Sequence, residues 1–278
     1  CAARPANGQN AQGHNFNGCL RSYGGIIMLQ IWEVLLQLPE GQRLHQSFGS
    51  VLHGALMQYA HTDFAEAMHR SALRPFSQFV YYDKARGSAV WQLAALNKEA
   101  AEEILYALGR LPQNLYLKQK EYVVQLSKPQ PVKQTSYKDM AEQFFTMTQP
   151  PRQAEFNFIT SASFKAFGSY KIYPDNAYIF RSLLKRWNAF CGGLVLEENN
   201  LEEHLAQAVK VTGYNLSLQQ YSVGGAPIDA FKGRYRLLFR GTQSQNRIAA
   251  LLAAYAEYAG IGVKTALGMG GVKISFLP

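Results

Sequence analysis

The sequence has few cysteines and no long apolar segment. Its three cysteines, Cys1, Cys19 and Cys191, are too few and too widely spaced for a disulfide framework or a four-ligand zinc site. The longest apolar run, Ile248 to Ala256, is about half as long as a helix that spans a bilayer. These shortages argue against a disulfide-rich secreted scaffold and against a membrane partner, and we expect a cytoplasmic protein.

Acidic residues are also scarce. Nineteen Asp and Glu face 28 Lys and Arg, which gives a net charge of +9 and a pI near 9.4. This excess favours a polyanionic partner such as nucleic acid, although an unselective basic surface fits the charge equally well. The 278 residues are 47% hydrophobic and 17% charged, which predicts a folded core divided between two domains.

The first 27 residues differ from the rest in composition. They are rich in Gly, Asn and Gln, and they contain no apolar block of signal-peptide length. Met28 stands directly before a strand-like run, so we expect residues 1–27 to be a leader or upstream segment outside the fold. A mature lipoprotein also begins with cysteine, as Cys1 does, but nothing downstream is typical of an envelope protein.

The first half of the remaining chain alternates between strand and helix patterns. Apolar periodicity, caps and turn residues predict the order βαββαβ, with the first α a pair of helices. The predicted strands are 29–38, 76–82, 89–96 and 115–126, and the predicted helices are 48–59, 63–70 and 98–108, with Thr62 and Asn97 as caps and Gly109 as a stop.

The second half repeats this order without evident sequence identity. Its strands are predicted at 154–167, 210–222, 228–239 and 271–277, and its helices at 175–190 and 243–258. Residues 128–152 carry four of the eleven prolines and read as a linker with a short helix. The sequence therefore predicts an α+β protein with two tandem ferredoxin-like domains, 28–127 and 153–278, an arrangement shared with RNA-recognition modules. The acidic insertion 194–208 is expected to face away from any polyanion.

Five glycines lie between the last helix and the last strand, in AGIGVKTALGMGGVK (259–273). The segment is not a Walker loop, since Val263 precedes Lys264 and no long helix follows, and it lacks the dinucleotide pattern GxGxxG after a strand. It is either a connection that needs positive φ angles, or a loop whose backbone N–H groups line a phosphate chain together with Lys264 and the Thr265 hydroxyl.

Six histidines are candidates for proton transfer near neutral pH. His14 lies in the leader and His204 in the acidic insertion, where both read as solvated residues. His69 closes the second predicted helix with Arg74 shortly after it; by spacing alone, such a histidine is usually a surface residue. His53 lies on the first helix, and His45 and His61 flank that helix as weaker candidates.

Three features together are similar to the CRISPR-associated endoribonucleases of the RAMP superfamily, which process precursor guide RNA. They are the segment GIGVKTALGMGG near the end, the two ferredoxin-like units and the early LHGAL (52–56). The resemblance implies a catalytic histidine after the first helices, in AMHRS (67–71), and a basic residue before the next strand. These positions are His69 and Arg74. Some relatives also use a tyrosine on the first helix, where this chain has Met57, so we consider His53 as the missing partner.

Basic residues concentrate in the second half. Lys232, Arg234 and Arg236 alternate along one predicted strand and should share a sheet face. Aromatic residues such as Phe164, Phe167 and Tyr170 can stack on bases, but the core is the commoner place for them. The residues predicted to bind RNA are Lys165, Lys171, Arg181, Lys232, Arg234, Arg236, Gly260, Gly262, Lys264, Thr265, Gly268 and Gly270.

The sequence thus predicts a metal-independent endoribonuclease, without cofactor, that binds CRISPR repeat RNA and cuts precursor crRNA. A second copy of the chain and subunits of an effector complex are further candidate partners. One alternative is a non-catalytic RAMP subunit that holds crRNA. The other is an unrelated structural or membrane-associated basic protein, for which the glycine-rich segment is only a connection.

Overall fold

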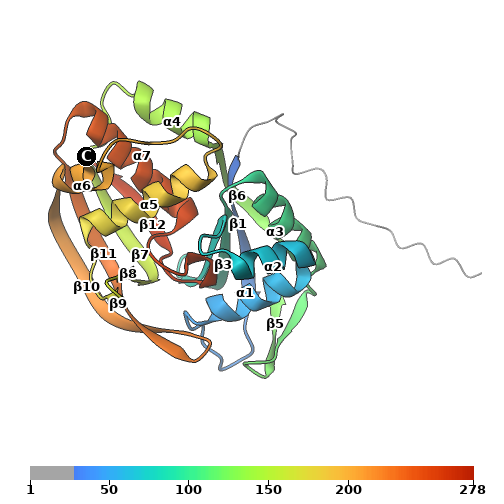
Figure 1. Cartoon of the computed structure of the whole chain (residues 1–278). Coiled ribbons are helices and arrows are strands. Elements are labelled where there is room, and N and C mark those ends of the chain that lie inside the picture. Colours follow the sequence, from blue (N-terminus) through green and yellow to red (C-terminus); the bar gives the residue numbers. More distant parts are fainter. Residues whose placement is uncertain (1–27) are drawn as a thin grey trace, which may run out of the picture.

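The computed structural model describes residues 28–278, and the expected leader 1–27 lies outside them. Two antiparallel sheets, each with helices packed on it, lie side by side along the chain (Figure 1). In each sheet the strand that comes first in the sequence is central, with the third beside it and the second outside the third. On the other side of the first strand lies the fourth strand in the second sheet, and two later strands in the first sheet. This is the ferredoxin-like order, so the predicted α+β class with two such units is confirmed.

The first sheet has the strand order β2-β3-β1-β5-β4, and one of its faces is covered by helices. Alternation along the first strand turns Trp32, Val34 and Leu36 toward those helices. The elements are β1 (Met28–Gln37), α1 (Phe48–Tyr59), α2 (Thr62–Arg70), β2 (Phe76–Asp83), β3 (Ser88–Ala95), α3 (Lys98–Arg110), β4 (Asn114–Leu117) and β5 (Tyr122–Leu126).

Of the three residues predicted to begin or end helices, one does so in the structure. Asn97 caps α3 as predicted, since its side chain accepts a 2.9 Å hydrogen bond from the Ala100 amide. Thr62 was predicted as a cap but is the first helical residue of α2, and His61 holds the cap position. Gly109 was predicted as a stop, yet α3 continues to Arg110, because a single glycine weakens a packed helix without ending it.

The segment predicted to be a linker contains a strand of the first sheet. This strand is β6 (Gln130–Ser136), which pairs with β1 from Met28 to Glu33 and leaves only Leu36 and Gln37 to pair with β5. The expected short helix follows as α4 (Tyr137–Thr146). The polar composition and the prolines of residues 128–136 are not typical of a strand, so β6 was not predicted. An edge strand tolerates proline, because the side that faces solvent forms no hydrogen bonds to another strand.

The second sheet has the order β10-β11-β7-β12. A small hairpin and a helix in the acidic insertion, neither of them predicted, join the expected elements. The elements are β7 (Gln153–Ala162), β8 (Phe164–Ala166), β9 (Ser169–Lys171), α5 (Asn176–Phe190), α6 (Leu201–Gln207), β10 (Val209–Val223), β11 (Ala226–Phe239), α7 (Gln243–Ala259), the 3-10 helix η2 (Thr265–Leu267) and β12 (Val272–Leu277).

The two halves share one apolar core. Leu29 and Ile31 of β1 pack in the same cluster as Trp187 of α5 and Tyr255 of α7. Buried polar bonds also cross between the halves, since the Ser77 hydroxyl donates to the Tyr258 carbonyl at 2.5 Å. The face of the first sheet that α1 to α3 leave open is therefore covered by α7 of the second half.

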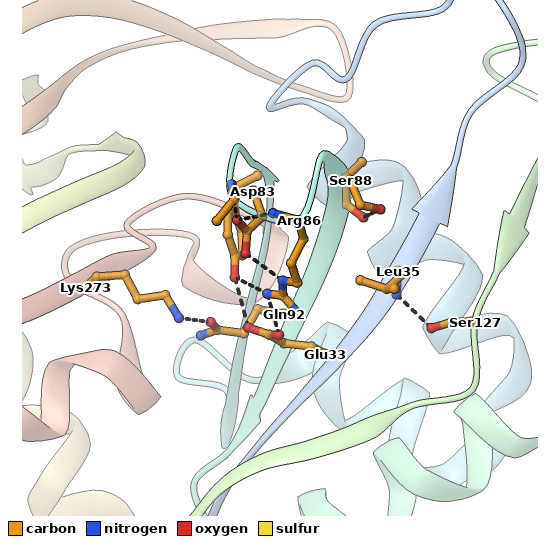
Figure 2. Close-up of polar contacts among 11 residues, drawn as sticks. Glu33, Leu35, Asp83, Arg86, Ser88, Gln92, Ser127 and Lys273 are labelled. Carbon is orange, nitrogen blue, oxygen red and sulfur yellow. Dashed lines mark hydrogen bonds and ion pairs between the residues drawn. The ribbon is translucent and has the colours of Figure 1, made fainter.

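A polar network joins the first sheet to the last strand (Figure 2). Glu33 accepts hydrogen bonds from the Tyr81 hydroxyl at 2.9 Å and pairs with Arg86 at 2.8 Å. Lys273 of β12 donates to Gln92 of β3 at 2.5 Å, and burial lowers the pKa of this lysine. Within residues 28–278, no helix combines the length and apolarity needed to cross a bilayer.

Candidate active site

The candidate site begins at the end of α2. Phe64 and Met68 are buried at helical spacing, which directs the neighbouring His69 outward into solvent. The chain then turns sharply, because the Ser71 hydroxyl donates to the Leu73 carbonyl at 2.6 Å. His69 is thus an exposed imidazole at a fixed helix end.

Arg74 lies against the same helix end. Its Nε donates to the Met68 carbonyl at 2.9 Å, so it caps a carbonyl of the last turn, one residue before His69. Within residues 28–278 its two Nη atoms make no hydrogen bond. Arg74 is partly buried, and this burial lowers its pKa. The guanidinium stays charged.

His53 is buried in the same neighbourhood. Only 8% of it is exposed, and its ring stacks on Phe76 at 5.9 Å between centroids. Burial, and after it the positive charges of Arg74 and His69, lower its pKa to about 4, while the Ala266 carbonyl acts in the opposite direction. The structure therefore brings all three predicted catalytic residues together, with His53 neutral near neutral pH.

The glycine-rich segment is wedged between the two halves. The Ala266 carbonyl of η2 accepts a 3.0 Å bond from Gln78 of β2, and the same amide donates to the Gly49 carbonyl of α1 at 2.6 Å. Gly268 has φ +102°, and a Cβ there would lie 2.8 Å from the Gly49 Cα. The loop thus packs tightly against the helix that carries His53.

The four glycines predicted to bind RNA have no free N–H group to offer a phosphate. The N–H groups of the four predicted glycines already donate within the protein, to Ala256, Ser182, Thr265 and Ser161 for Gly260, Gly262, Gly268 and Gly270 respectively. Thr265 is 1% exposed, so its hydroxyl does not reach solvent. The glycines permit close packing, and of this loop Lys264 presents the charged side chain.

A pocket of about 590 Å³ lies beside the end of α2. We call it the basic pocket. Ala72 and Leu73, just after His69, form one part of its wall. Its cationic lining comes from the second half of the molecule: Lys165, Arg181, Lys185, Arg186 and Lys264. Four of the residues predicted from sequence to bind RNA, the cations Lys165, Arg181 and Lys264 together with Gly262, therefore share a cavity with the segment that follows His69.

Arg186 is a pocket residue outside the set predicted to bind RNA. It stands next to Lys185 on α5, and Lys185 is exposed whereas Arg186 is 5% exposed. It donates to the Arg74 carbonyl at 3.3 Å and has no carboxylate partner among the described residues. Burial lowers its pKa to about 10, and the charge of Arg74 contributes. A helical pattern cannot reveal this, because the covering residues come from the other half.

The acidic insertion does not face away from the predicted RNA-binding residues. Leu201 and Leu205 bury one side of α6 against the core beside α5. Glu202 and Glu203 then pair with Arg181 at 3.2 Å and 2.8 Å. The expectation was wrong because burial of its apolar side fixes the position of an amphipathic helix. The positions of the charged side chains on its other side result from that burial.

The predicted strand residues form a separate surface. Lys232, Arg234 and Arg236 alternate with buried residues on β11, so they do share the face of the second sheet opposite its helices. Arg236 pairs with Glu155 of β7 at 2.7 Å, and burial lowers the pKa of Lys232. Arg234 and Arg236 line a hollow of about 190 Å³ that shares no residue with the basic pocket.

The remaining described histidines make local contacts. His61 stacks on Tyr106 at 3.7 Å and pairs with Glu103 at 3.0 Å, which ties the start of α2 to α3. His45 bonds to Ser47 at 2.8 Å, and His204 pairs with Glu198 at 3.2 Å. None of them joins His69, and His14 lies outside the described residues.

Fold and site together define a class: a protein with two ferredoxin-like units that places histidine and arginine beside a cationic pocket. A family model described as CRISPR-associated endoribonuclease Cas6 matches residues 156–272. A CRISPR-associated endoribonuclease Cas6 from Mycobacterium tuberculosis is 23% identical over 228 residues, which are 82% of this chain and 72% of that protein. The one from Streptococcus thermophilus is 26% identical over 235 residues, 82% of this chain and 92% of that protein.

Solved structures agree on the fold. A Cas6 product complex superposes with a TM-score of 0.71 at 19% identity, covering 89% of this chain and 99% of the other. Thermus thermophilus Cas6 gives 0.65 at 20% identity, covering 91% and 100%. The resemblance seen in the sequence motifs is thus confirmed: the chain is a relative of the CRISPR-associated endoribonuclease Cas6, and its predicted enzyme class, endoribonuclease, is confirmed with it.

Proposed function

We propose that this protein binds CRISPR repeat RNA and cleaves precursor crRNA into guide units without a metal ion. The proposal rests on one observation above all: Arg74 donates to the carbonyl of Met68, next to the exposed His69, and the residues Ala72 and Leu73 between His69 and Arg74 line the basic pocket. The similarity to Cas6 supports the choice of RNA. A cytoplasmic location, a homodimer and effector-complex partners stay predictions.

The reaction uses the nucleophile that RNA carries. A base takes the proton of the 2'-hydroxyl, the 2'-oxygen forms a bond to the adjacent phosphorus, and the bond from phosphorus to the 5'-oxygen breaks. An acid gives a proton to that leaving oxygen. The products are a 2',3'-cyclic phosphate upstream and a 5'-hydroxyl downstream. Cations near the phosphate stabilise the charge of the five-coordinate transition state.

We assign the roles in proton transfer and phosphate binding from the solvent exposure of each side chain. We assign proton transfer to His69, because it is the exposed imidazole of the cluster, and phosphate binding to Arg74 through its outer nitrogens. His53 is the candidate for the second proton-transfer group. With a pKa of about 4 it is a neutral base near pH 7 and not an acid, so in this scheme it accepts a proton while His69 donates one.

A non-catalytic crRNA-binding subunit is the second candidate function. It is favoured by Met57, which stands on α1 where some relatives carry a tyrosine and whose thioether cannot transfer a proton, and by the 8% exposure of His53. In this alternative the basic pocket binds RNA, and no residue transfers a proton. It predicts that RNA binding survives while no strand is cut.

The deciding experiment incubates the protein with a labelled repeat RNA from its own genome in EDTA. We expect one cut, which disappears when the mapped site carries a 2'-deoxy substitution and slows by about 10²- to 10⁴-fold in His69→Ala. His204→Ala is the matched control, since that histidine lies in α6 and pairs with Glu198. Tight binding without a cut in the unaltered protein would move the assignment to the binding subunit.

A further inference from the structure

The hairpin formed by β8 and β9 presents an aromatic side chain to solvent beside the basic pocket. Its two-residue loop consists of Phe167 and Gly168, with φ of +51° and +76°. Such loops usually carry Asn or Asp before the glycine, because most side chains disfavour positive φ. Phenylalanine here accepts that strain and is 95% exposed. Neither packing nor turn chemistry explains it.

The surroundings of this ring are cationic. The Lys171 Nζ lies 5.9 Å from the centre of the Phe167 ring, and Lys165 Nζ lies 6.0 Å from that of Tyr170. Phe167, Tyr170 and Lys165 all line the basic pocket, and so does Leu73. By contrast, Phe164 of the same hairpin is 5% exposed and belongs to the core. The hairpin therefore buries Phe164 in the core and leaves Phe167 exposed to solvent.

We propose that Phe167 stacks on an unpaired nucleobase of the RNA whose backbone lies in the basic pocket. The inference rests on the proposed function and adds a base-binding subsite to it. An exposed ring between lysines matches a single-stranded nucleic acid, which offers both a flat apolar base and a charged phosphate. The subsite favours a substrate with an unpaired base near the cut, because the pocket is also lined by Leu73, which follows His69 by four positions in the chain.

The test measures binding of a repeat RNA made uncleavable by a 2'-deoxy group at the cut site. We expect Phe167→Ala to weaken binding about tenfold at every salt concentration, because stacking carries no charge, while Phe167→Trp retains the affinity. Lys165→Ala should instead lower the salt dependence by about one ion. Tyr214→Ala is the control: that ring is 74% exposed on β10 but does not line the basic pocket.

A crosslinking arm identifies the contact directly. A repeat with 5-bromouridine placed in turn at each unpaired uridine should crosslink to the β8–β9 hairpin, and the product should vanish in Phe167→Ala. Equal affinity of Phe167→Ala and the unaltered protein would overturn the proposal. The proposal would also be overturned if Phe167→Ala changed the sedimentation of the protein and left RNA binding unchanged. Phe167 would then be a contact between two copies of the chain.

These outcomes separate the subsite from the function beneath it. If the unaltered protein cuts the repeat and Phe167→Ala binds it equally well, only the subsite is wrong. If the unaltered protein binds no repeat RNA, the proposed function is wrong and the subsite falls with it. Binding that depends on Phe167 without any cut would keep the subsite in a non-catalytic subunit.

Discussion

The two halves of the molecule have the same strand order but carry different chemistry. The first half holds His53, His69 and Arg74, while the second supplies Lys165 and Lys264 of the basic pocket. The glycine-rich segment of the second half packs on α1 of the first and brings the two sets together. The two similar halves thus contribute different residues to one candidate site.

The largest loss of stability is expected from a substitution at the contact between the two halves. Gly268→Ala places a Cβ 2.4 Å from the Tyr221 hydroxyl and 2.8 Å from the Gly49 Cα, at φ +102°. We expect a loss of about 3 to 5 kcal/mol in the free energy of unfolding, from overpacking and backbone strain together. Chemical denaturation measures it.

Gly41→Ala is the matched control. That glycine also has positive φ, at +77°, but nothing lies within 4 Å of its added Cβ. A loss of about 1 kcal/mol is expected there. Equal losses for the two variants would show that backbone strain, and not the contact between the halves, is what the loop glycines relieve.

The buried histidine should make stability depend on pH. Its pKa is lowered from 6.5 to about 4 in the folded state, so the unfolded chain binds the extra proton first as pH falls. His53 therefore contributes stability above pH 6.5 that is lost between pH 6.5 and about 4, on the order of 3 kcal/mol. Denaturation of His53→Asn at pH 7 and pH 4.5 should show a smaller difference than the unaltered protein. The same difference in both would contradict the burial of this imidazole.

Arg186 offers a test of whether the buried charge serves folding or function. An arginine buried without a carboxylate partner destabilises a fold, so Arg186→Met should leave the free energy of unfolding unchanged or raise it. The affinity for repeat RNA should nevertheless fall about tenfold, because the basic pocket loses a charge that water does not screen. Filter binding beside thermal unfolding measures both. Lys185→Met, an exposed neighbour, should lose less affinity, and equal losses would remove the special role of Arg186.

The smallest effect is expected where a cation is already paired. Arg236 is neutralised by Glu155 at 2.7 Å, whereas Lys264 lines the basic pocket. Lys264→Ala should weaken RNA binding several-fold and lower the slope of log affinity against log salt by about one, and Arg236→Ala should change both less. The reverse order would place the RNA on the open face of β11 instead of in the basic pocket.

Local signals determined much of the fold. Period-two and helical spacing placed nearly every strand and helix of the second half, and Asn97 marked the start of α3. They failed at β6, whose strand character comes from its partner β1, and at Gly109, which the packed helix passes through. Propensity is a property of a short segment, and a packed neighbour can outweigh it.

For the site, the sequence by itself determined the residue types: the histidines, the excess of cations and the glycine-rich segment. Only the tertiary structure decided their environments. Residues far apart in the chain bury Arg186 beside exposed Lys185, engage the N–H groups of Gly262 and Gly270, and leave Phe167 in solvent while Phe164 enters the core. The hydrogen bonds from Arg186 to Arg74 and from Gly270 to Ser161 join segments more than a hundred positions apart, and no local pattern records such contacts.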